Sequence, residues 1–112
     1  MAKGIVNLIN DISGVKRSRV MIIRELLKVL EYINSSSKGN VIYISYRRIV
    51  GIMQYRRKLS NEDKSVVKSI LNSVITDVNA RKIDENKGIY AVDKGALSLM
   101  IMRLKEALSE LA

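Results

Sequence analysis

Residues 41–78 read VIYISYRRIVGIMQYRRKLSNEDKSVVKSILNSVITDV, and three successive parts of this stretch predict three different elements. Residues 41–44 are β-branched or aromatic throughout and too few for a helix, so we expect a short strand there. Ser45 can then cap a short helix over residues 46–54. The buried side of this helix would consist of Ile49, Ile52 and Met53. Ser60 then opens the clearest helix of the chain.

This longer helix, predicted over residues 61–78, carries its own start signal. Ser60 with Asp63 resembles a capping box, in which each side chain accepts a hydrogen bond from the other residue's backbone N–H. Glu62 and Asp63 also lie favourably at the positive end of the helix dipole. Its apolar face comprises Val67, Ile70, Leu71, Val74 and Val78. The opposite face is polar, small and mostly uncharged, and it comprises Ser65, Lys68, Ser69, Asn72, Ser73 and Thr76.

Apolar residues at helical spacing predict two helices before this stretch. The first covers residues 3–13 and stops at Gly14. The second covers residues 16–34, and residues 35–40 form a loop by composition. The apolar side of the second helix comprises Val20, Ile23, Leu26, Leu27, Leu30 and Ile33. Its start and outer side would carry the basic residues Lys16, Arg17, Arg19, Arg24 and Lys28.

Residues 79–93 predict a β-hairpin whose turn is formed by residues 84–88. Asn86 and Gly88 supply the tolerance for left-handed backbone that such turns need. A last helix is expected over residues 95–111, with the spacing of a coiled-coil seam. The seam consists of Leu97, Ile101, Leu104, Leu108 and Leu111. Because only two heptads are present, the helix is either a dimerisation helix or an ordinary core helix.

The chain has the size of one domain, residues 1–112, and the apolar and charged fractions of an ordinary globular protein. Its formal charge of +9 is unevenly placed, since residues 16–58 hold eleven basic and two acidic side chains, which is the whole excess. A positive field in one part of a chain indicates a surface that faces a polyanion. The alternative is that the charge serves general solubility.

The chain has no Cys and no His. These absences remove disulfides, the thiol nucleophile, the usual general base and the commonest metal ligand. We find no Gly-rich phosphate loop and no carboxylate pair at metal-ligand spacing, and we therefore expect no enzyme, no cofactor and no metal. The longest apolar runs are about four residues, against roughly 20 for a membrane helix. We expect a soluble, cytoplasmic protein with no membrane partner.

The order and length of the elements in residues 16–93 resemble a winged helix-turn-helix domain, as in small archaeal or viral regulators. In that family a helix, a short strand, two helices and a two-stranded wing follow one another. The resemblance implies a mainly α fold with a small β-hairpin, in the α+β class. Residues 46–54 and 61–78 would form the helix-turn-helix and residues 80–93 the wing. The flanking helices resemble dimerisation additions, so the resemblance implies a homodimeric transcriptional regulator that binds specific sequences of double-stranded DNA.

Two copies of Tyr-Arg-Arg flank the short helix, and in such a domain both ends of that helix lie close to the DNA backbone. An arginine guanidinium matches phosphate oxygens bidentately, and a tyrosine hydroxyl can donate to the same backbone. We therefore expect phosphate contacts from Tyr46, Arg47, Arg48, Tyr55, Arg56, Arg57 and Lys58. The alternative is that Tyr43, Tyr46 and Tyr55 complete the core and that the arginines are a solvated rim.

We expect the polar face of the longer helix to contact the bases. Asn can form two hydrogen bonds with adenine, and Ser or Thr can hydrogen-bond several different bases. The candidates on this face are Ser65, Lys68, Ser69, Asn72 and Thr76. Plain solvent exposure would produce the same face. On the wing, phosphates or the minor groove are within reach of basic side chains. These are Arg81, Lys82 and Lys87.

Two other functions stay open. Tyrosines beside arginines can stack bases, so the chain could bind RNA or single-stranded DNA. A winged helix can also bind a protein instead of DNA, as a replication or partition adaptor. In that interpretation the apolar terminal helices are the working surface, and the basic segment is a soluble face.

Overall fold

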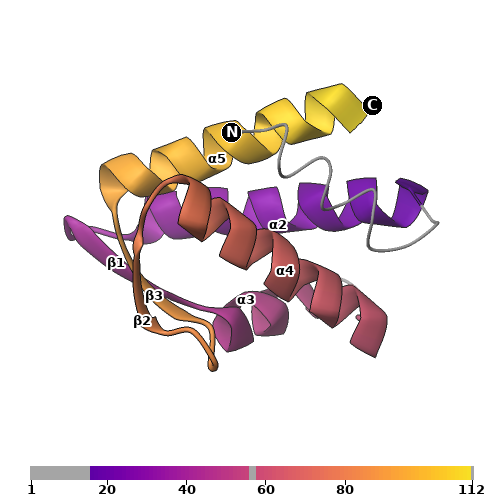
Figure 1. Cartoon of the computed structure of the whole chain (residues 1–112), viewed down its shortest axis with the longest axis horizontal. Helices are drawn as coiled ribbons and strands as arrows, with labels where there is room; N and C mark the ends of the chain where they lie inside the picture. Colours follow the sequence, from indigo (N-terminus) through magenta and orange to yellow (C-terminus); the bar gives the residue numbers. More distant parts are fainter. Residues whose placement is uncertain (1–15, 56–57, 112) are drawn as a thin grey trace.

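The computed structural model describes residues 16–55 and 58–111, which form four helices and a small three-stranded sheet (Figure 1). In chain order the elements are α2 (Lys16–Ser36), β1 (Val41–Ser45), α3 (Tyr46–Met53), α4 (Asn61–Asp77), β2 (Arg81–Asp84), β3 (Ile89–Asp93) and α5 (Lys94–Leu111). The helix predicted at residues 3–13 lies outside the described residues. The mainly helical α+β class is confirmed, and so is each of the other predicted helices and strands.

The sheet is antiparallel throughout, with β3 as the middle strand between β1 and β2. The predicted hairpin is the pair β2–β3, and β1 adds to the other side of β3 with Ile44 opposite Tyr90 and Ile42 opposite Val92. These four side chains are buried in the core. Because successive residues of a strand point to opposite faces, Tyr43 points away from the core and is exposed.

Local capping fixes where the two helices after β1 begin. The N–H of Arg48 donates to Ser45 Oγ at 3.1 Å at the start of α3. At α4 the N–H of Asp63 donates to Ser60 Oγ at 3.0 Å, and the N–H of Ser60 donates to Asp63 Oδ2 at 3.2 Å. Both predicted caps are therefore confirmed, and each satisfies a backbone donor that the first turn of a helix leaves without a partner.

Helix α2 is central to the core, because α3, α4 and α5 all pack on it. The prediction that the basic residues of α2 lie outside is wrong for Arg19, which is 2 % exposed. Its Nε and Nη2 make no hydrogen bond within the described part of the chain. On α3 the buried side includes Val50, whereas Ile52 is only half-buried, so this short helix is rotated slightly from the predicted orientation.

Helix α5 lies side by side with α2 (Figure 1). Leu97 and Leu104 are fully buried, Ile101 is 8 % exposed and Leu108 packs partly buried against the core. The side chain of Leu111 lies outside the described residues. The apolar row of α5 thus packs on the chain's own core, which is the second of the two interpretations that the sequence left open.

Candidate nucleic-acid interface

Tyr46 joins three elements at one end of the sheet. Its backbone N–H donates to Gly88 O at 2.8 Å, which ties the start of α3 to the β2–β3 turn. Its hydroxyl donates to Lys64 O at 3.1 Å, which ties α3 to the first turns of α4. Lys68 Nζ lies 5.8 Å from the centre of the Tyr46 ring, within the range of a cation–π contact. We call this arrangement of Tyr46, Lys64, Lys68 and Gly88 the three-element junction.

The β2–β3 turn fits into this junction because residue 88 is a glycine. Gly88 has a φ of +67°, and a Cβ at this position would lie 2.8 Å from Tyr46 Cβ. The second predicted left-handed residue, Asn86, does not adopt a positive φ, and its carbonyl accepts a hydrogen bond from Lys68 Nζ at 3.2 Å. The turn is therefore held on α4 and α3 at once.

The Tyr46 hydroxyl is committed within the fold. A tyrosine hydroxyl is protonated at neutral pH and can donate to Lys64 O, and burial raises the pKa of Tyr46 further above its ordinary value of 10.0. The sequence predicts that this hydroxyl donates to a DNA phosphate, but in the structure its proton already has an acceptor. Tyr46 positions the neighbouring elements, and any contact with DNA falls to the residues around it.

The other tyrosines divide clearly between core and surface. Tyr43 is 64 % and Tyr55 is 92 % exposed, so the interpretation in which these tyrosines complete the core is wrong for both. Tyr90, at 1 % exposed, is the tyrosine that fills the core. Burial, and secondly the charge of Glu85, raise the pKa of Tyr90.

Exposed cations lie on α3, on the connection after it and on the hairpin; Arg47 and Lys87 adjoin the three-element junction, whereas Arg81, opposite Ala91, lies toward the other end of the sheet. The set comprises Arg47 and Arg48 on α3, Lys58 on the α3–α4 connection, and Arg81 and Lys87 on the hairpin. The ion pairs within the described residues include none of these five side chains. The predicted contacts Arg56 and Arg57 lie outside the described residues.

Several other cations are paired with carboxylates. Lys82 on β2 lies 3.2 Å from Glu85, which leaves it less available than Arg81. On α5, Arg103 donates to Asp77 of α4 at 2.9 Å, and Lys105 lies 3.8 Å from Glu31 of α2. The cations of α5 are thus partly neutralised, in contrast to the five exposed cations of α3, the α3–α4 connection and the hairpin.

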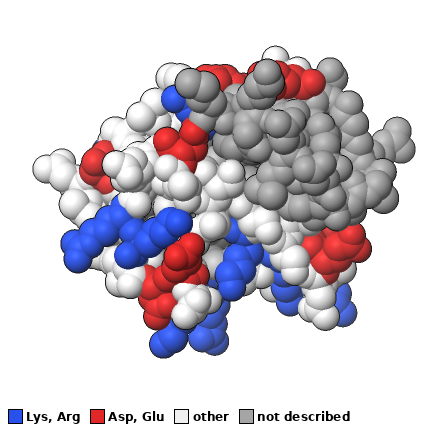
Figure 2. Space-filling view, in the orientation of Figure 1, with Lys and Arg blue, Asp and Glu red and all other residues white. Residues whose placement is uncertain are grey.

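Figure 2 shows one face of this arrangement. Lys and Arg side chains gather along the lower part of the view, where Figure 1 places the hairpin, α3 and α4. Asp and Glu side chains lie among them. The face is therefore rich in cations but interrupted by acidic groups.

The polar face of α4 is only partly open to solvent. Ser65, Lys68 and Thr76 are exposed, whereas Ser69 and Asn72 are half-buried. Asn72 Oδ1 is buried and has no hydrogen-bond partner among the described residues, so this amide is not presented to a base in the way that the sequence suggested. Because Lys68 Nζ already bonds Asn86 O, the exposed side chains of this row that remain for a base are Ser65 and Thr76.

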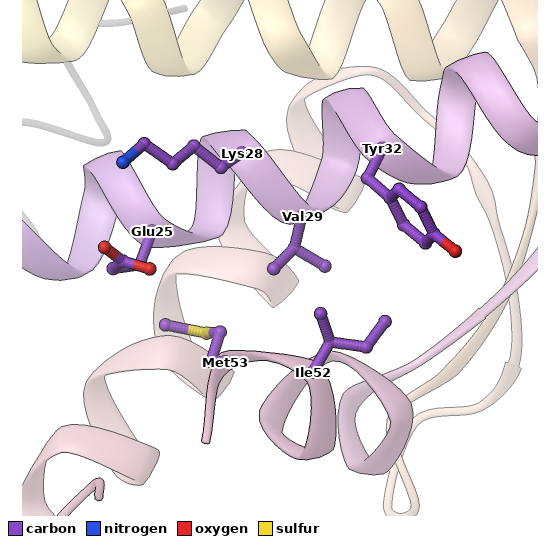
Figure 3. A pocket seen from close by; sticks show the side chains of 6 residues that line it. All are labelled: Glu25, Lys28, Val29, Tyr32, Ile52 and Met53. Atoms are coloured by element: carbon purple, nitrogen blue, oxygen red, sulfur yellow. The ribbon is translucent and has the colours of Figure 1, made fainter. Parts of the chain in front are cut away.

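Two surface grooves lie outside the junction. One, of about 190 Å³, runs between α2 and α3, and Figure 3 shows Tyr32 and Ile52 pointing toward each other across it. It is lined by Glu25, Lys28, Val29, Tyr32, Ile52 and Met53. The other, of about 330 Å³, lies beside the sheet, where α4 leads into β2. It is lined by Val41, Val78, Asn79, Ala80, Arg81, Ala91, Asp93 and Ala96.

Residues 16–55 and 58–111 contain no group of three or more His, Cys, Asp or Glu side chains placed to hold a metal ion. No helix within the same ranges is both long and apolar enough to cross a membrane. Comparison with protein families, with curated proteins and with solved structures found no match for this chain.

Proposed function

We propose that the chain is a double-stranded DNA-binding protein of the winged-helix type, with α3 and α4 as its helix-turn-helix and β2–β3 as its wing. The element order α2, β1, α3, α4, β2, β3 supports this proposal, because it is the order of the family that the sequence resembles. The exposed polar side chains of α4 would face base edges in the major groove. Recognition of a particular sequence would make the protein a transcriptional regulator.

The observation that carries the proposal is the three-element junction, together with the exposed cations that lie on the elements it joins and on the α3–α4 connection. Phosphates along a duplex have fixed spacings, so a protein that contacts several of them gains affinity when its cations are held on rigid elements. Tyr46 fixes α3, α4 and the hairpin turn relative to one another through two hydrogen bonds. Arg47 follows Tyr46 directly, and Lys87 precedes Gly88, so both cations are anchored next to the junction.

The roles of the side chains follow from their chemistry. Arg47 and Arg48 would each grip a phosphate through the planar guanidinium, and Lys87 would contact a phosphate as a point charge. Ser65 and Thr76 would read base edges. Glu62, exposed at the start of α4, would accept from a cytosine amino group and would otherwise oppose phosphates there.

The test is fluorescence anisotropy of a labelled duplex over a salt series, with unlabelled single-stranded DNA and RNA as competitors. We expect tight binding that only the duplex competes away, with a log–log salt slope of roughly −0.9 per neutralised phosphate. The variant Arg47→Ala/Arg48→Ala should weaken binding to every duplex. It should also flatten the slope by about 0.9 for each phosphate that the protein no longer neutralises.

The matched control is Lys38→Ala/Lys105→Ala, which removes the same charge from the α2–β1 loop and from α5. Its salt slope should stay that of the unaltered protein. An equal loss of affinity in both variants would mean that only net charge matters. Competition by single strands would favour the single-strand or RNA binder, and weak binding at low salt would favour the protein adaptor, so either result would overturn the proposal.

A further inference from the structure

Strand β1 leaves one row of backbone groups open. The N–H of Tyr46 donates to Gly88 O, and the N–H of Lys94 donates to Asn40 O. In an antiparallel pair of strands, hydrogen-bonded residue pairs alternate with non-bonded pairs. Because the residues at positions 40 and 46 are hydrogen-bonded to their partners, residues 42 and 44 of β1 are the ones that hydrogen-bond to β3. The N–H and C=O groups of Val41 and Tyr43 therefore point away from β3, as does the N–H of Ser45. No described strand pairs with this side of β1.

The two edges of the sheet differ in how they are protected. The outer strand β2 has the sequence RKID, with charged side chains and a shift of register between Lys82 and Asp84. Charges and bulges are the devices by which proteins stop an edge strand from pairing with another chain. The outer strand β1 has the sequence VIYIS, with no charge, no proline and no register shift. By the same physical rule, β1 is an edge that can accept a further strand.

The side chains on the open face of β1 are apolar or aromatic. Val41 is 54 % and Tyr43 is 64 % exposed. Ile42 and Ile44, which alternate with them, are buried and hold the strand on the core. The strand is thus fixed by its inner side chains, while its edge and outer side chains are free to meet a partner.

We propose that β1 pairs with β1 of a second copy of this chain, in antiparallel orientation about a two-fold axis through Tyr43. In this register Tyr43 lies opposite Tyr43 of the second copy, and Val41 lies opposite Ser45 of the second copy. The N–H and C=O of Tyr43 then meet those of the second Tyr43, and the N–H of each Ser45 meets the C=O of Val41 in the other copy, so the edge is complementary to itself, as a two-fold interface requires. The tyrosines form a cross-strand aromatic pair on the outer face.

A second copy of β1 suits this edge because the strand carries no charged side chain, so the two-fold pairing brings no like charges directly opposite each other within the strands. Two cations flank the strand, Lys38 in the preceding loop and Arg48 in α3, and both are exposed. The antiparallel arrangement brings Lys38 of each copy toward Arg48 of the other. Dimerisation should therefore strengthen as salt screens this repulsion, whereas DNA binding weakens with salt.

The inference goes beyond the proposed function and is tested without DNA. Sedimentation equilibrium of the full chain from about 1 µM to about 1 mM should show a monomer–dimer equilibrium that shifts toward the dimer with added salt. Tyr43→Lys, which places two lysines opposite each other, should raise the dimer dissociation constant by about tenfold or more. The control Ile83→Lys introduces the same charge on β2, where residue 83 is also exposed, and should leave the equilibrium unchanged.

Amide hydrogen exchange separates this interface from any other. In a β1-paired dimer the amides of Tyr43 and Ser45 exchange slowly, although in the monomer they have no strand partner. In the Tyr43→Lys variant the amide of Ser45 should exchange fast, while those of residues 42 and 44 stay protected and report that the fold is intact. A protein that is monomeric across the series overturns the proposal. So does a dimer in which the Tyr43 amide exchanges fast.

Discussion

At the scale of single residues, Tyr46 serves the fold at a position where the sequence predicted a contact with DNA. Its ring is half-buried, and its hydroxyl reaches a carbonyl on α4. The sequence predicted that Tyr46 and Tyr55 would act alike, because they begin identical Tyr-Arg-Arg triplets. Their environments differ because Tyr46 begins α3 beside the hairpin turn, whereas Tyr55 follows the end of α3 and is 92 % exposed. Repeats in sequence carry no information about such neighbours.

The junction also makes a prediction about two glycines. Gly88→Ala should lower the free energy of unfolding by about 2 kcal/mol or more, because alanine at a positive φ is strained and its Cβ meets Tyr46. Gly51→Ala is the matched control, since nothing lies within 4 Å of a Cβ there and residue 51 is inside α3. It should raise stability by about 0.5–1 kcal/mol. Urea denaturation measures both, and two changes of the same sign would contradict the geometry of the turn.

At the scale of elements, the predictions that succeeded rest on local signals. The starts of α3 and α4 could be predicted from Ser45, Ser60 and Asp63, because an N-terminal cap is formed by residues within one turn of the helix that it begins. The β-hairpin follows likewise from a short turn between two β-prone segments. The pairing of β1 with β3 joins residues far apart in the chain, and the sequence pattern could not specify its register.

The apolar row of α5 marks the limit of periodicity as a guide. Apolar residues spaced four and three apart indicate that one side of a helix is buried. They do not indicate whether that side packs on α2 or on another molecule. Here the packing is intramolecular. A truncation that removes α5 would therefore expose the core and unfold the protein, and it would not test dimerisation.

Point substitutions test the assignment of α5 to the core. Leu104→Ala should destabilise the fold by about 2–5 kcal/mol, because Leu104 is fully buried and the change leaves a cavity. Met102→Ala removes a side chain of similar size that is 52 % exposed on the same helix, and it should change stability by about 0.5 kcal/mol or less. Thermal unfolding at several protein concentrations is the measurement. If the cost of Leu104→Ala appeared only at concentrations where dimers form, α5 would be an interface after all.

At the scale of the whole molecule, the exposed positive charge and the strand edge that can pair with another strand lie on different elements. The exposed cations of the candidate interface belong to α3, the connection after it and the hairpin, whereas the open backbone edge belongs to β1. The sequence located the excess of charge in residues 16–58 but could not show that cations on α5 are neutralised by Asp77 and Glu31. That contrast appears only when helices distant in sequence are packed together.

Substitutions in the polar row of α4 can separate contacts with bases from attraction to phosphates. Ser65→Ala/Thr76→Ala removes two exposed hydroxyls without changing charge. If these hydroxyls contact base edges, affinity for random duplex and the salt slope should stay the same. The set of duplexes selected from a randomised pool should change, with discrimination lowered by about 1–3 kcal/mol at each position read.

The control for this experiment is Ser98→Ala/Ser109→Ala, which removes two exposed hydroxyls from α5. It should select the same duplexes as the unaltered protein. Identical selection by the α4 variant would mean that α4 reads no bases through these groups, and the interface would then act through the phosphate backbone alone. A protein of that kind binds wherever the duplex fits its cations, so the role of a sequence-specific regulator would be lost while the DNA-binding function remained.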